Sequence, residues 1–288
     1  MKTILVPTDF SKAARTAADV ACGIAAKTGA KLILLHVTEG FSGGSFNVEG
    51  EVASTKDWGD RFITMKIIEK AREQLMKLTN ELSGKRVDVT SLLRMGTAYH
   101  GMHTIITERS VDLIVMGTQG ASGIDEFMLG SNTAKIVRRA HCPVLSISRK
   151  PSQQEFKTVV YATSLREDEE MFARFVRKTQ EIYDSTIHMV HINTPGMFLD
   201  DTIVKEKMKA FAKKRRLEKC NLHVFNDFSP EEGILHFADS VNADMIAMAT
   251  HGRKGLAHVL DGSIAERVVN HSHRPVLTFV VGRSVKKK

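Results

Sequence analysis

The sequence contains only three cysteines, Cys22, Cys142 and Cys220, among its 288 residues. They are scattered and odd in number, and no CxxC pair occurs, which argues against a disulfide framework and is typical of a reducing compartment. No apolar run approaches the ~20 residues that a membrane helix requires. No charged and then apolar leader precedes the first strand-like run. We therefore expect a cytoplasmic protein with no membrane partner.

Aromatic residues are also scarce, at 6%, and the net charge of +8 is spread along the chain. A nucleic-acid-binding face would show a clustered basic stripe with aromatic side chains between the charges. Only Lys213–Arg216 approaches such a cluster, and we interpret it as a solvated helix end. We therefore expect no nucleic-acid partner.

Several catalytic motifs are missing. The sequence has neither GxxxxGK[ST], which excludes a P-loop, nor GxGxxG, which weakens a dinucleotide-binding interpretation. We find no base, metal triad or arginine pair placed for phosphoryl transfer. The closely spaced pairs His100 with His103 and His271 with His273 come with no cysteine or carboxylate arranged for zinc. We therefore expect no catalytic residue and no resident metal.

An internal repeat is the strongest organisational signal in the chain. Residues 2–9 match 157–164, residues 31–37 match 186–192, and residues 112–117 match 244–249. A polar segment that contains Pro151 lies between the halves. The repeat predicts two similar domains, at residues 1–149 and 155–284.

Each half alternates short apolar runs with helical patterns. Most of the runs are apolar almost throughout, as expected for a parallel sheet with helices on both faces, so each half is predicted to be a doubly wound α/β domain. In the first half we expect strands at 2–7, 31–37, 87–93, 112–116 and 143–148, and helices at 12–28, 58–83, 97–109 and 131–140. In the second half we expect strands at 157–162, 186–192, 221–226, 244–249 and 275–281.

A set of glycines follows the fourth predicted strand. Gly117 and Gly120 come directly after the apolar run, and Gly130 with Ser131 opens the next helix. Glycines let a ligand approach the backbone closely, and a helix N-terminus offers unpaired N–H groups with a partial positive charge. Together these features predict a cradle for a polyphosphate. The alternative is that the glycines only shape a tight turn and a helix cap.

These motifs in combination resemble the universal stress protein family. The pattern Gly-x2-Gly-x9-Gly-Ser occurs together with Val6–Ser11 at the first strand, His36-Val37 at the second and Cys142–Val144 before the last. The repeat makes the whole chain similar to a tandem member. The resemblance implies a Rossmann-like fold and pairing through the last strand, so we expect the two final strands to pair as an internal pseudo-dimer. A homodimer of the chain is left open.

The resemblance also implies a bound adenine nucleotide, ATP, with Mg²⁺ as an optional companion. Residues expected around the base and ribose are Pro7, Thr8, Asp9 and Val37, with Met116 and Gly117 as the floor of the pocket and Gly120, Gly130, Ser131 and Asn132 around the phosphates. A carboxylate at Asp9 could accept hydrogen bonds from sugar hydroxyls or from the exocyclic amine. Its alternative role is to cap the first helix beside Ser11.

The second half departs from this pattern. Pro7, Asp9 and Gly117 are replaced there by Ala162, Ser164 and Ala249. The corresponding site is therefore predicted to be weaker or vacant, and its residues would be Ser164, Ile192, Ala249, Gly252, Gly262 and Ser263.

These inferences predict a cytoplasmic stress-response protein that binds ATP in its N-terminal domain and acts as a sensor or regulator on an unidentified protein partner. The residues favour a binding protein over an enzyme, with slow ATP hydrolysis as the most that we expect. The alternative function is a nucleotide-independent scaffold or chaperone-like adaptor that binds a protein or an apolar ligand.

Overall fold

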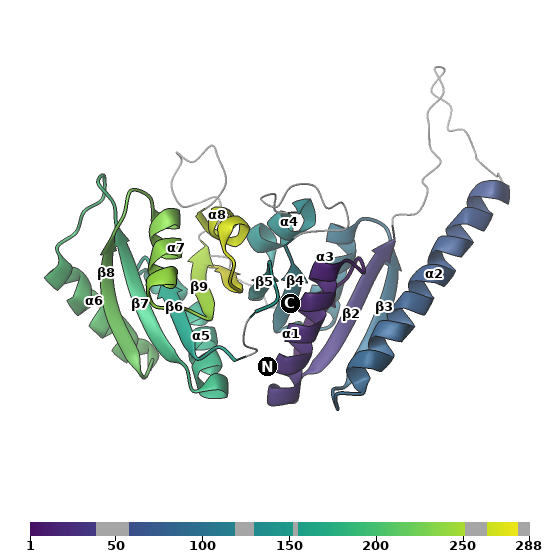
Figure 1. Ribbon diagram of the computed structural model, residues 1–288, viewed down its shortest axis with the longest axis horizontal. Helices are drawn as coiled ribbons and strands as arrows, with labels where there is room; N and C mark the ends of the chain where they lie inside the picture. The colour runs from purple at the N-terminus through teal and green to yellow at the C-terminus, as the bar shows by residue number, and fades with distance from the viewer. Residues whose placement is uncertain (39–57, 119–129, 152–154, 251–263, 282–288) are drawn as a thin grey trace, which may run out of the picture.

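The computed structural model describes residues 1–38, 58–118, 130–151, 155–250 and 264–281 (Figure 1). The first half contains β1 (Thr3–Pro7), α1 (Lys12–Thr28), β2 (Lys31–Thr38), α2 (Trp58–Ser83), β3 (Val89–Met95), α3 (Ala98–Glu108), β4 (Leu113–Gly117), α4 (Ser131–Arg139) and β5 (Val144–Ile147). The second half contains β6 (Thr158–Ala162), a 3₁₀ turn (Glu167–Glu169), α5 (Glu170–Tyr183), β7 (Thr186–Asn193), α6 (Asp201–Arg215), β8 (Cys220–Asn226), α7 (Pro230–Ser240), β9 (Met245–Thr250), α8 (Ile264–His271) and β10 (Val276–Val280).

Within the described ranges, ten strands form one continuous sheet in the order β3-β2-β1-β4-β5-β10-β9-β6-β7-β8. Each half is parallel throughout, as the continuously apolar strands predict. The halves meet where β5 pairs antiparallel with β10, with Leu145 opposite Leu277. The doubly wound fold and the internal pseudo-dimer are therefore confirmed, and β3 and β8 become the outer edges (Figure 1).

The two faces of the sheet are packed differently. On the face covered by α1, α2, α5 and α6, one hydrophobic cluster runs through both halves and includes Leu145 and Leu277. On the opposite face, α3 and α4 cover one cluster and α7 and α8 cover another. There, α4 and α8 approach each other across the seam, and the Arg138 guanidinium donates to both carboxylate oxygens of Glu266. The seam is thus both an apolar core and a polar junction.

Helix α1 shows how the sequence fixes its own boundaries. The Ser11 hydroxyl accepts a hydrogen bond from the Ala14 N–H at 3.2 Å, which is a side-chain cap of the first turn. Gly29 ends the helix with a φ of +66°, a conformation in which glycine carries no steric cost. Both α1 and α2 span the residues that the pattern predicts, while 39–57 lies outside the described part of the chain.

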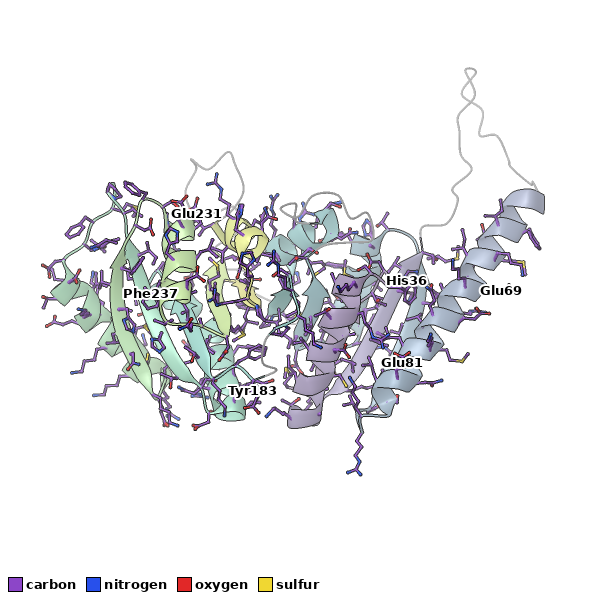
Figure 2. The ribbon with its side chains drawn as sticks, viewed as in Figure 1. His36, Glu69, Glu81, Tyr183, Glu231 and Phe237 are labelled. Carbon is purple, nitrogen blue, oxygen red and sulfur yellow. The ribbon has the colours of Figure 1, made fainter. Side chains whose placement is uncertain are left out.

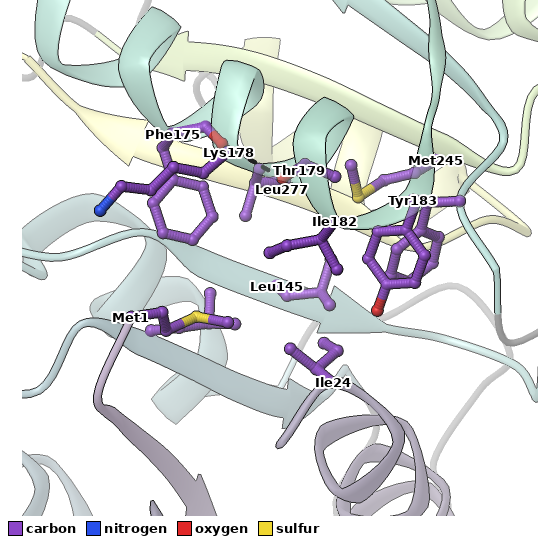
Figure 3. Close-up of a pocket in the computed structure, with 12 residues that line it drawn as sticks. Met1, Ile24, Leu145, Phe175, Lys178, Thr179, Ile182, Tyr183, Met245 and Leu277 are labelled. Carbon is purple, nitrogen blue, oxygen red and sulfur yellow. Dashed lines mark hydrogen bonds between the residues drawn. The ribbon is translucent and has the colours of Figure 1, made fainter. Parts of the chain in front are cut away.

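A small cavity lies at the seam, near the amino ends of β4 and β9 (Figure 3). Its volume of about 30 Å³ is room for one or two water molecules. Apolar side chains such as Leu145 and Leu277 dominate its lining, together with Tyr183, whose buried hydroxyl has no hydrogen-bond partner among the described residues. The cavity is therefore too small for an organic ligand, and its lining offers few polar partners to a water molecule. No helix within the described ranges has the length and apolarity to cross a lipid bilayer.

The seam core makes a prediction about stability. Leu145 is 2% exposed, so Leu145→Ala is expected to lower the free energy of unfolding by about 2–5 kcal/mol through lost burial and an unfilled cavity. The matched control is Leu199, which is 45% exposed. Leu199→Ala is expected to change the free energy of unfolding by about 0.5 kcal/mol or less. Urea unfolding followed by circular dichroism measures both. Equal effects would contradict a packed seam.

Candidate functional site

The predicted site residues of the first half lie at one edge of the sheet. Strand β1 lies between β2 and β4, so the strand order reverses beside it. In doubly wound sheets, ligands bind at such a reversal, in the crevice beyond the carboxyl ends of the strands. The end of β1 brings Pro7, Thr8 and Asp9 to this edge, and β2 brings Val37. Met116 and Gly117 arrive at the end of β4. Gly120 lies outside the described residues.

The start of α4 is tied to the end of β4. The Gly130 N–H donates to the Thr118 carbonyl at 2.9 Å, and the Thr133 hydroxyl donates to the Gly117 carbonyl at 3.0 Å. Within the described chain no side chain caps α4, and its first turn carries no acidic residue. Ser131 and Asn132 are exposed there. Among the described residues, no acidic side chain of the first turn therefore offsets the positive end of this helix dipole.

Gly117 has a structural role that the ligand interpretation did not include. A Cβ at this position would lie 2.8 Å from the Ala13 carbonyl carbon and 3.0 Å from the Ala14 nitrogen, so the first turn of α1 packs directly on the glycine. In the second half the position is Ala249, and there the chain forms a 3₁₀ turn before α5 begins at Glu170. The first helical turn after β6 is thus 3₁₀, whereas α1 is α-helical from Lys12.

The turn after β1 is repeated after β6. Phe10 has a φ of +64° and Leu165 a φ of +61°, an uncommon conformation for residues with side chains. In each turn the threonine two residues earlier accepts the backbone N–H, at 3.1 Å for Thr8 and at 2.9 Å for Thr163. The Asp9 carboxylate is exposed, and one of its oxygens accepts the Ser11 N–H at 3.0 Å. Asp9 therefore helps to close the turn before α1, whereas the side-chain cap of the helix comes from Ser11.

A histidine holds this turn against the neighbouring strand. The Nδ1 of His36 lies 2.7 Å from the Thr8 carbonyl oxygen and so donates to it, and the ring packs on Phe10 with centroids 4.5 Å apart (Figure 2). In the second half His191 forms the same bond to the Thr163 backbone, while burial lowers the pKa of its imidazole. The sequence showed this histidine only as part of a motif, because its partner is far along the chain.

Val37 and Ile192 pack closely on helices. A Cβ on Gly101 of α3 would lie 2.7 Å from a Val37 methyl carbon, and one on Gly233 of α7 would lie 2.6 Å from an Ile192 methyl carbon. These contacts hold α3 and α7 close to the ends of β2 and β7. Both aliphatic side chains are half-buried. Each therefore has a packing role beside any contact with a ligand.

The second half contains a buried carboxylate that sequence reasoning missed. Glu169 is 1% exposed and accepts hydrogen bonds from the hydroxyls of Tyr161 at 2.9 Å, Thr163 at 2.7 Å and Ser164 at 2.7 Å. Burial and the nearby Glu169 charge raise the pKa of Tyr161 well above its usual value. In sequence Glu169 lies in an acidic run, which normally indicates a solvated surface, so no local signal revealed it.

This carboxylate changes the second candidate site. Ser164 occupies the position of Asp9, and its hydroxyl donates inward to Glu169. Ala249 is half-buried at the end of β9. Gly252, Gly262 and Ser263 lie outside the described residues. The part of the site that the structure describes therefore offers no exposed carboxylate at the end of β6, unlike the first half.

Comparisons with known proteins agree with this architecture. The model of the universal stress protein family matches residues 1–148 and again residues 155–279. The chain belongs to the universal stress protein family. It is a tandem member, because the family match occurs once in each half.

Individual relatives match either one half or the whole of this tandem protein. A universal stress protein of Methanocaldococcus jannaschii is 27% identical over 158 residues, which cover 52% of this chain and 97% of the relative. A second one from the same organism is 28% identical, over 53% of this chain and 85% of the relative. A solved universal stress protein of Archaeoglobus fulgidus has the same fold, with a TM-score of 0.74 at 18% identity, over 96% of this chain and 98% of that one.

The close contact of α1 with β4 gives a second prediction. Gly117→Ala is expected to lower the free energy of unfolding by about 1–3 kcal/mol, because the methyl group overlaps the α1 backbone. Gly196 has open space around it and serves as the control, so Gly196→Ala should not destabilise the protein. Thermal unfolding of the two variants is the measurement. An unchanged unfolding midpoint for Gly117→Ala would contradict the prediction, because α1 would then move away from β4 at little cost.

The buried carboxylate gives a third prediction. Glu169→Gln removes the charge that three hydroxyls and one N–H stabilise, and it is expected to destabilise the protein by about 1.5–3 kcal/mol. Its neighbour Glu170 is exposed, so Glu170→Gln is the matched control and should have a small effect. Chemical denaturation would test the pair. Indistinguishable midpoints would argue that Glu169 contributes nothing to the turn.

Proposed function

We propose that the first half of this universal stress protein binds an adenine nucleotide, ATP, and that the protein acts as a nucleotide-dependent sensor or regulator. The observation that carries the proposal is a pair of features at one crevice. The exposed Asp9 carboxylate lies at the end of β1, and the uncapped N-terminus of α4 lies beyond the end of β4. The carboxylate suits the sugar hydroxyls of a nucleotide, and the helix N-terminus suits its phosphate oxygens.

The phosphate side of the proposal rests on α4. Its first turn has no side-chain cap and no acidic residue in the described chain, so no described capping side chain occupies its free N–H groups. Such a terminus favours an anion through its N–H groups and its dipole together. The two hydrogen bonds from Gly130 and Thr133 hold this terminus in place without a ligand. Little reorganisation is then needed on binding.

The nucleoside side rests on β1 and β2. Pro7 and Val37 present half-buried apolar surface at the ends of these strands, suited to the faces of a base. Thr8 is buried and occupied in closing the turn, so Asp9 is the residue that we assign to the sugar. Met116 is 5% exposed, and it supports the floor from below.

We further propose that the second half binds a nucleotide weakly or not at all. The support is the inward hydrogen bond of Ser164 to Glu169, which occupies the hydroxyl at the position of Asp9. The two halves would then differ in occupancy although their folds are alike.

A second candidate function is a scaffold or adaptor that binds a protein without nucleotide. Exposed apolar side chains at both ends of the sheet favour it. On α2, Phe62 and Met65 are 63% and 60% exposed, and at the far end Phe198 and Phe228 are 68% and 87% exposed. Exposed apolar patches mark protein contacts more often than chance surface does.

Calorimetric titration with ATP distinguishes the two functions, and matched variants locate the site. The wild-type chain is expected to bind one equivalent. Asp9→Asn keeps the acceptor for the Ser11 N–H but removes the charge, and it should weaken ATP binding about tenfold or more. Ser164→Ala, at the matching position of the second half, should leave the affinity within about twofold.

Two equal sites for each chain would refute the asymmetry between the halves. An equal loss from Ser164→Ala would refute the assignment to the first half. If wild-type protein bound no ATP, the nucleotide proposal would fail and the adaptor function would be favoured.

A further inference from the structure

Two histidines lie side by side at the outer edge of the second half. His188 is on β7 and His223 is on the edge strand β8, and in the parallel register His188 is opposite Asn221 while His223 is opposite Val190. The two histidines are therefore diagonal neighbours, and because side chains alternate along a strand they share the face covered by α7. This position is far from the crevice at the end of β1.

The two imidazoles are arranged with their nitrogens close together. The Nδ1 of His188 lies 3.2 Å from the Nε2 of His223, and the rings are nearly parallel, at 11°, with centroids 5.2 Å apart. Phe237 of α7, labelled in Figure 2, packs on His223 with centroids 4.9 Å apart and limits how far that ring can turn. Both histidines are half-buried, so each keeps some contact with solvent.

The surroundings of both imidazoles favour the uncharged form. Burial lowers the pKa of His188 and of His223, and the neighbouring His188 ring and Lys205 lower that of His223 further. A neutral imidazole has one N–H and one lone pair. When His188 carries its proton on Nε2 and His223 carries its proton on Nδ1, both facing nitrogens present lone pairs to the space between them.

We propose that His188 and His223 form a binding site for a divalent first-row transition-metal ion, with Nδ1 of His188 and Nε2 of His223 as its ligands. Metal–imidazole bonds are about 2.0–2.1 Å long, so two nitrogens on one ion lie roughly 2.9–3.4 Å apart at ordinary bond angles. The observed 3.2 Å falls within this range. The site therefore needs only a change of tautomer, not a rearrangement of the strands.

The donor set defines the class of ion. Imidazole nitrogens suit copper, nickel and zinc, and Cu²⁺ binds most tightly among the divalent ions of this series. Within the described ranges no third histidine, cysteine or carboxylate completes a cluster, so the described residues supply two ligands. A bound ion would join the edge strand β8 to β7. It would therefore stabilise the end of the sheet that has no further strand beside it.

Titration of the full chain with Cu²⁺, with glycine as a competing ligand, tests the site. We expect one strong site for each chain, with two imidazole nitrogens in its pulsed electron paramagnetic resonance spectrum. His188→Gln and His223→Gln should each weaken this binding at least tenfold. The double variant His100→Gln/His103→Gln, which removes an exposed pair on α3, should leave it unchanged. Sub-stoichiometric Cu²⁺ should also raise the thermal midpoint of the wild-type protein but not of the two single variants.

Several results would overturn the proposal. Equal Cu²⁺ binding by wild-type protein and His188→Gln would do so, and so would loss of the strong site in the His100/His103 variant. If either single variant failed to fold without metal, the imidazole ¹⁵N resonances of the wild-type protein would decide. Zn²⁺ should then shift Nδ1 of His188 and Nε2 of His223, and unchanged resonances at these two atoms would refute the site.

Discussion

The antiparallel pairing of β5 with β10 is the contact on which the rest of the molecule depends. Each half alone would leave a strand with unpaired backbone groups and an uncovered Leu145 or Leu277. The pairing gives hydrogen-bond partners to the backbone groups of both strands. It also extends the hydrophobic core on one face through both halves. Because the two strands belong to one chain, the partner is always present at high effective concentration.

The two halves keep the same fold but differ in sequence at the turns that follow β1 and β6. The first half keeps Gly117, so α1 packs directly on β4 and the turn at Asp9 remains open to solvent. The second half has Ala249, begins α5 after a 3₁₀ turn and buries Glu169 among three hydroxyls. The two turns share one hydrogen bond, in which the hydroxyl of Thr8 or Thr163 accepts a backbone N–H. They differ in the methyl group of Ala249 and in the buried Glu169 carboxylate. This divergence is the support for the proposal that the two halves bind nucleotide unequally.

In the first half, the polar groups near the end of β1 form hydrogen bonds within the turn that follows this strand. His36 donates to the Thr8 carbonyl, Thr8 accepts the Phe10 N–H, and Asp9 accepts the Ser11 N–H. These bonds keep Phe10 in an unfavourable conformation and hold the end of β1 in one position. A preformed turn lowers the ordering cost of binding. The hydrogen bonds of Gly130 and Thr133 likewise hold the start of α4 in one position.

The sequence by itself determined the repeat, the doubly wound fold, the bounds of α1 and α2, and which residues reach the carboxyl edge of the first half. It could do so because apolar periodicity, Ser11 and Gly29 are local signals whose physical meaning does not depend on distant residues. Only the tertiary structure decided that Gly117 is needed by α1, that Glu169 is buried, and that His188 lies beside His223. Each of these depends on a partner from another element or strand, and the free energy of such a contact is not written in the residue's own neighbourhood along the chain.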